Sequence, residues 1–151
     1  MFTLIITIIA IALVAALAIA SIYYGGSAFT QGSAKSNASA LVAQAQQIAG
    51  ANDLYANDKS GAFDTSIGDL VSGGYLASQP QIPSDVGGTW AVDSSNNVTD
   101  AGVTNQTVCE EINAEATGVS TLTAPPSAQQ TSQTFGCYGT ASPFTVFYTG
   151  A

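Results

Sequence analysis

The chain has no histidine and almost no positive charge. Among its 151 residues, Lys35 and Lys59 are the only basic ones. Without histidine, Ser-His-acid and Cys-His catalytic arrangements are excluded, and a Ser-Lys dyad would have to use one of these two lysines. We therefore expect a protein that is not an enzyme, with no catalytic residues and no cofactor.

Acidic residues are also absent from the first third of the chain. All ten lie between Asp53 and Glu115, so residues 53–151 carry ten acids against one lysine, a net charge of −9. Such a segment repels nucleic-acid phosphates and anionic lipids. We expect a solvated acidic surface and no direct nucleic-acid binding.

Residues 1–24 form an uncharged apolar run that only Thr3, Thr7 and Ser21 interrupt. As a helix, this run is about 36 Å long, against about 30 Å for the hydrocarbon core of a bilayer. No basic residue precedes the run and no cleavage-site pattern follows it, unlike a secretory signal peptide. We expect that a basic leader ahead of Met1 has been removed and that the hydrophobic helix remains on the mature protein.

Cysteine is scarce, with Cys109 and Cys137 as the only two thiols. Two cysteines without histidine do not supply the four ligands of a zinc site, and Asp58, Ser60 and Asp64 do not have EF-hand spacing. We therefore expect no metal site. An even cysteine count in a chain with an export-type N-terminus favours a disulfide between Cys109 and Cys137.

Residues 25–56 are predicted to continue the same helix as an amphipathic half. Their apolar residues recur at intervals of four and three and so fall on one face: Ala34, Ala38, Leu41, Ala45 and Ile48. Between the two halves stand Gly25 and Gly26. Adjacent glycines cost about 1 kcal/mol each relative to alanine in a helix interior, so a helix break is expected there.

Residues 57–151 are predicted to form one small β-rich domain with a disulfide loop. The patterns favour a helical turn over 66–71, a strand over 89–92, a turn over 94–97 leading to Val98, a short helix over 107–116, a polar loop over 124–133 and a strand over 143–149. The predicted fold class is α+β, with the long N-terminal helix packed on an antiparallel sheet of four or five strands.

Two segments of the chain resemble the type IV pilin family in its processed form. The opening Phe2-Thr3-Leu4-Ile5 is similar to the start of many mature pilins. The segment 69–76, DLVSGGYL, with Pro80, Pro83 and the GGTW at 87–90, is similar to what pilins and secretion pseudopilins place after their long helix. A first-position Met and the cysteine spacing resemble the type IVb group.

The chain departs from the family at the fifth mature position, where pilins usually carry a glutamate. That position is Ile5, or Ile6 if Phe2 is the mature end. In the family this glutamate neutralises the N-terminal amine of a neighbouring subunit. Thr3 and Thr7 are the polar candidates near the equivalent place here.

The resemblance implies a major-type structural subunit that polymerises through its N-terminal helix into an extracellular type IV pilus. Its partners would be identical copies, the inner membrane before assembly and the pilus assembly machinery; methylation of the N-terminal amine and cell adhesion are family expectations. The residues expected to build the filament core are Met1, Phe2, Thr3, Leu4, Ile5, Thr7, Ala12 and Ala16.

Two alternatives remain open at this stage. Within the same class, the chain would be a minor pilin or a type II secretion pseudopilin. From a different class, it would be a monomeric bitopic membrane protein with an exported ligand-binding domain, because small residues are common in membrane helices generally.

Overall fold

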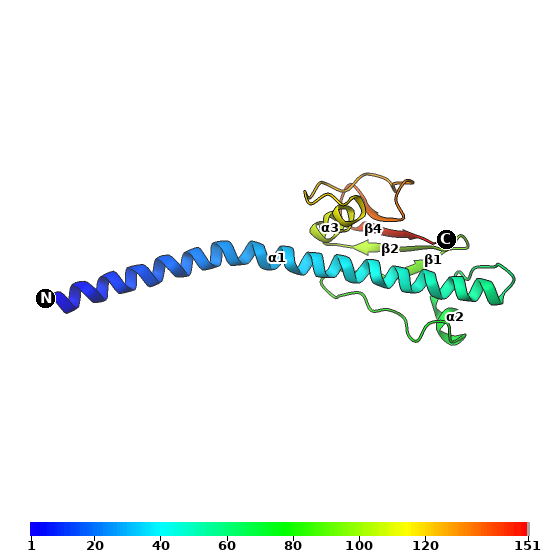
Figure 1. Cartoon of the computed structure of the whole chain (residues 1–151), viewed down its shortest axis with the longest axis horizontal. Coiled ribbons are helices and arrows are strands. Elements are labelled where there is room, and N and C mark those ends of the chain that lie inside the picture. The colour runs from blue at the N-terminus through cyan, green and yellow to red at the C-terminus, as the bar shows by residue number, and fades with distance from the viewer. Residues whose placement is uncertain (151) are drawn as a thin grey trace. The chain divides into compact units, whose positions relative to one another are not determined.

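The computed structural model describes residues 1–150 and has an α+β fold, as expected. Figure 1 shows the long helix α1 and the small sheet beside its second half. The elements are α1 (Phe2–Asp58), α2 (Ile67–Ser72), β1 (Trp90–Val92), β2 (Asn97–Val103), α3 (Gln106–Thr117), β3 (Phe135–Tyr138) and β4 (Phe144–Thr149).

The chain divides into two compact units. Unit 1 is Met1–Ser33, which is helical from Phe2 onward, and unit 2 begins at Ala34. This boundary follows from the side chains, because Ala34 is the first residue of α1 that is buried. From there on, α1 belongs to the core of unit 2.

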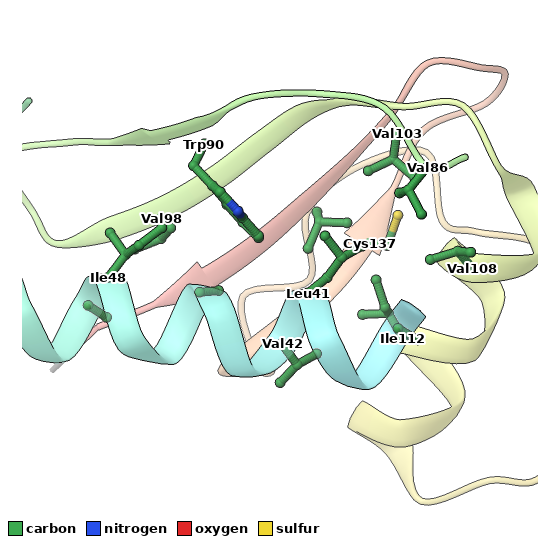
Figure 2. Close-up of a cluster of buried hydrophobic side chains, with 14 of the residues drawn as sticks. Leu41, Val42, Ile48, Val86, Trp90, Val98, Val103, Val108, Ile112 and Cys137 are labelled. Carbon is green, nitrogen blue, oxygen red and sulfur yellow. The ribbon is translucent and has the colours of Figure 1, made fainter. Parts of the chain in front are cut away.

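The core of unit 2 is built on one stripe of α1. The five apolar residues that the sequence places on one face are all buried: Ala34, Ala38, Leu41, Ala45 and Ile48. Figure 2 shows Leu41 and Ile48 of α1 and Val98 of β2 gathered in one apolar cluster. Small alanines between the larger residues let the helix backbone approach the sheet closely, and the predicted apolar stripe is confirmed from Ala34 to Ile48.

The sheet has four antiparallel strands in the order β1-β2-β4-β3. Along β2, Val98 and Asp100 face the core. The register of pairing with β4 shifts between Asp100 and Val103. The strands expected around Trp90 and after Pro143 are confirmed as β1 and β4, and the four-stranded sheet lies within the expected range.

The break expected at Gly25 and Gly26 is absent, because α1 is continuous from Phe2 to Asp58. A cost of about 1 kcal/mol per glycine is small against the cooperative hydrogen bonding of a 57-residue helix. Opening the ladder there would also leave backbone groups unpaired beside an apolar segment. The glycines therefore weaken the helix without interrupting it.

Helix α3 is joined to β3 by the predicted disulfide between Cys109 and Cys137, and both cysteines are fully buried. A bridge across 28 positions stabilises the fold by about 3 to 4 kcal/mol in the chain-entropy model. Beside it, Asn113 Nδ2 donates to the carbonyl oxygen of Cys137, and Cys137 N–H donates to Asn113 Oδ1, each at 2.8 Å. The Asn113 amide thus pairs with the free edge of β3 as a further strand would.

Candidate functional site

Unit 1 presents apolar side chains in every direction around its helix. Every residue from Met1 to Tyr24 is exposed. Even the least exposed of its large apolar side chains, Ile5 and Ile9, are 54% exposed. A helix that is apolar all round is one that is surrounded by other helices or by lipid in its working state. We call the residues Met1–Tyr24 the apolar collar.

The collar is long enough and apolar enough to cross a membrane, with an 18-residue window of mean hydropathy 2.9. Its length and composition alone support this statement. The same segment carries all of the residues that the sequence assigned to a filament core. All of them are exposed; Met1 precedes α1 and the others lie on its first turns.

Small residues leave a shallow, widely open hollow on one face of the collar. Its lining residues are Ala10, Ile11, Val14, Ala15 and Ala18. A second shallow, open hollow lies beyond the glycine pair and is lined by Ala28, Phe29, Gly32 and Ser33. Hollows of this kind admit the side chains or the backbone of a second helix.

Thr7 is the polar group nearest the N-terminal amine whose hydrogen bonds are defined. Its Oγ1 lies 2.8 Å from the carbonyl oxygen of Leu4 and 3.0 Å from that of Thr3, and donates to these carbonyls. The hydroxyl proton is therefore used inside the helix. The oxygen lone pairs remain free to accept a bond from an incoming N–H group.

Unit 2 is a closed, acidic body. Among the described residues there is no group of three or more His, Cys, Asp or Glu side chains placed to hold a metal ion. Its acids are used locally instead: Asp93 accepts from Ser95 N–H, Asn97 N–H and Asn97 Nδ2 in the β1–β2 turn. Burial pushes the pKa of Asp93 upward, but these hydrogen bonds outweigh it and hold the pKa below the usual range.

Tyr75 joins the segment after α2 to the end of α1. Its hydroxyl donates to Asp58 Oδ2 at 2.9 Å, and its ring packs edge-to-face on Tyr55. The hydrogen bond to Asp58 raises the pKa of Tyr75, because the phenolate would lose that bond and face a carboxylate. This contact fixes the segment that resembles the region after the long helix in pilins.

The sequence does not predict the four buried polar residues of the described chain, which are Asn52, Asn96, Asp100 and Asn113. Asn96 is fully buried in the β1–β2 turn, where its Nδ2 donates to Asp53 Oδ1 at 2.7 Å and its Oδ1 accepts from Asn52 Nδ2. Asp100 is fully buried in β2. In the sequence, an Asp or Asn near a turn looks the same whether it is exposed or buried, so no local signal marks either residue.

No family model, curated protein or solved structure matches the chain. The resemblance to type IV pilins therefore rests on the quoted residues and on the α+β layout.

Proposed function

We propose that this chain is a structural subunit that polymerises through its apolar collar into an extracellular filament of the type IV pilus kind. The observation that carries the proposal is that the collar is exposed on all sides while unit 2 has a complete core of its own. A domain that is already closed does not need the collar for its own folding. The collar is therefore free to serve an interaction outside the subunit.

The collar cannot remain in water. Burying one large apolar side chain is worth about 1.5 to 3 kcal/mol, and the collar exposes such side chains from Met1 to Tyr24. Before assembly, the inner membrane would cover this surface, and after assembly, the collars of neighbouring subunits would do so. Because lipid is as apolar as leucine, the step from lipid to filament depends on close packing.

The small residues of the collar support this packing role. They are Ala10, Ala12, Ala15, Ala16, Ala18 and Ala20. Several of them line the hollow that also exposes Ile11 and Val14. A neighbouring helix seated there would gain dispersion contacts that fluid acyl chains provide less well. The acidic unit 2 would then face the aqueous exterior of the filament.

The glycine pair has a place in the same proposal. A Cβ added at Gly25 or at Gly26 would have no packing neighbour within 4 Å. Packing therefore does not require glycine at either position. Their effect is on the backbone, and we propose that the helix opens there in the filament and not in the free subunit. A filament structure with unbroken helical bonding from Ala16 to Ala34 would contradict this.

Two other candidates remain. The first is a monomeric bitopic protein whose exported domain binds a ligand, and the second, within the filament class, is a minor pilin or secretion pseudopilin. The length of the collar favours the first of these, because a single membrane-spanning helix needs no partner.

Electron microscopy of material sheared from cells that express the chain separates these candidates. Fibres built mainly of this chain support the major subunit, and fibres that contain it as a trace component indicate a minor one. Retention of the chain in detergent-extracted membranes as a monomer, with no fibres, would overturn the filament proposal.

A further inference from the structure

A single carboxyl group is enclosed in the sheet of unit 2. Asp100 on β2 is 0% exposed and lies on the same face of the strand as Val98, toward the core. Its cross-strand partners are Trp90 on β1 and Val146 on β4, both apolar and buried. A carboxylate in such surroundings has lost its hydration, which is costly for the charged form.

Two backbone groups hold the carboxyl in place and leave half of it unpaired. Oδ1 accepts from Thr89 N–H at 2.9 Å and from Gly102 N–H at 3.1 Å. Oδ2 is buried and, among residues 1–150, has no hydrogen-bond partner. The two N–H bonds stabilise the carboxylate only in part, because an ionised carboxylate has about four acceptor sites to fill.

The backbone is closed around the carboxyl group by glycines. A Cβ on Gly88 would overlap the carboxylate, and a Cβ on Gly102 would overlap the Gly88 backbone. Gly88 has φ of +107°, and the register of β2 shifts just after Asp100. The turn at Gly87–Thr89, the strand β1 and the irregular part of β2 therefore meet at this one side chain.

No positive charge compensates the carboxyl group. The titratable residues of unit 2 on the elements around it are Lys35, Asp53, Tyr55 and Asp58 on α1, Asp85 before the glycine turn, Asp93 after β1 and Tyr148 on β4. Burial raises the pKa of Asp100, the N–H groups of Gly102 and Thr89 oppose this rise, and none of those titratable residues contributes to it. Burial therefore favours the protonated form of Asp100 in the folded state.

We propose that Asp100 is a buried proton-binding site that makes the sheet of unit 2 more stable in acid than at neutral pH. The folded protein binds this proton more tightly than the unfolded chain, where an aspartate has a pKa of about 3.9. The contribution is complete below that pH and is lost as the pH rises through the pKa of the folded state. On ionisation, the Gly87–Val92 segment, which we call the β1 edge, loosens from β2. This proposal does not depend on filament formation.

The test compares three forms of the full chain in detergent micelles: the wild type, Asp100→Asn and Asp93→Asn. Each variant removes one acid, so both change the net charge equally. Urea unfolding is followed by the fluorescence of Trp90, the only tryptophan, which pairs directly with Asp100. Midpoints are measured from pH 4 to pH 7.5.

We expect Asp100→Asn to match the wild type near pH 4 and to have the higher midpoint at pH 7.5. Asp93→Asn should lose midpoint relative to the wild type at pH 7.5, because the pKa of Asp93 is lowered in the fold. Equal pH dependence of the wild type and Asp100→Asn would overturn the proposal.

A direct titration keeps the proposal testable if Asp100→Asn fails to fold. The carboxyl carbon of Asp100 in the wild type is followed by NMR after labelling of aspartate. A midpoint above about 3.9, together with a midpoint for Asp93 below it, supports the site. A midpoint for Asp100 at or below that value would overturn it.

Discussion

Asn96 shows how one residue can join distant parts of unit 2. It has φ of +58° in the β1–β2 turn, its side chain bonds to Asn52 and Asp53 on α1, and its carbonyl oxygen accepts from Gly150 N–H at 3.0 Å. Asparagine suits this place because it tolerates the left-handed region and its amide both donates and accepts. The turn, the helix and the end of β4 are thereby fixed together.

Replacing Asn96 by alanine should therefore be costly. Asn96→Ala removes the hydrogen bonds to Asn52 and Asp53 on α1 and leaves alanine at positive φ with no side-chain bond to offset the strain. We expect a loss of about 2 to 4 kcal/mol in the free energy of unfolding. Asn57→Ala, at an exposed position on the same helix, is the control and should stay within about 0.5 kcal/mol. Urea unfolding measures both, and similar midpoints would show that the contacts of Asn96 are dispensable.

Alanine substitutions at Gly88 and Gly118 distinguish the cost of backbone strain from the cost of a steric clash. Both have positive φ, but a Cβ on Gly88 would overlap Asp100, whereas nothing lies within 4 Å of a Cβ on Gly118. We expect Gly118→Ala to cost about 1 kcal/mol through its φ alone, and Gly88→Ala to cost about 3 kcal/mol or more. Thermal unfolding of the two variants checks the difference. Equal losses would mean that the sheet can move away from Gly88 freely.

Individual residues also show which features of the fold can be predicted from the sequence. The periodic stripe from Ala34 to Ile48 predicts its own burial, because spacing on a helix is a local property. The burial of Asp100 depends on Gly88 and Gly102, which are brought to it only by strand pairing. No pattern in the neighbourhood of Asp100 contains that information.

At the scale of elements, the sheet depends on how its two edges are protected. One edge, β1, has only three residues. The other edge, β3, was not predicted, because Gly136 and Cys137 in FGCY are not strong strand formers. Gly136 is needed there because a Cβ would touch the ring of Phe147. The outer side of β3 is covered by α3 through the Cys109 bridge and the Asn113 amide.

The Asn113 amide should contribute substantially to the free energy of unfolding. Asn113→Ala leaves the buried N–H and C=O of Cys137 without partners, for which we expect a loss of about 2 to 4 kcal/mol with the disulfide intact. The better helix propensity of alanine offsets only a few tenths of this. Gln106→Ala, exposed on the same helix, should change stability by about 0.5 kcal/mol at most.

Amide hydrogen exchange gives a second measurement of the same contact. The Cys137 N–H should exchange faster in Asn113→Ala than in the wild type, while the β2–β4 amides keep their order of protection. Unchanged exchange at Cys137 would mean that another group covers the edge of β3. The edge-strand role of Asn113 would then be wrong.

At the scale of the whole molecule, the two units have opposite chemistry. The collar has no charged side chain, and all of the acids lie in unit 2. The sequence predicts this difference in chemistry, because a run of 24 apolar residues and an acidic segment need different surroundings. The boundary between the units lies between Ser33 and Ala34, whereas the sequence placed its divisions after residues 24 and 56. The helix is continuous through Gly25 and Gly26, contrary to the prediction. The prediction counted the local cost of the two glycines, which is small against the cooperativity of a long helix.

The absence of a glutamate near the N-terminus gives the sharpest test of the filament proposal. A buried amine with no partner costs several kcal/mol. In the filament, the amine of one subunit would therefore bond to the hydroxyl oxygen of Thr7 or to a backbone carbonyl of its neighbour. Thr7 is suited to this because its proton is already donated to Leu4 and Thr3 within its own helix.

Thr7→Val keeps the shape of the side chain and removes the oxygen, so it should lower the yield of sheared filaments. Ile9→Val, with a similarly small change and no hydrogen bond to lose, is the control and should assemble close to the wild-type level. The yield is measured against the amount of subunit in the membrane, so that a loss of expression is not mistaken for a loss of assembly. Equal yields for the two variants would contradict the role of Thr7, and close packing of the collar alone would then set the axial position of each subunit.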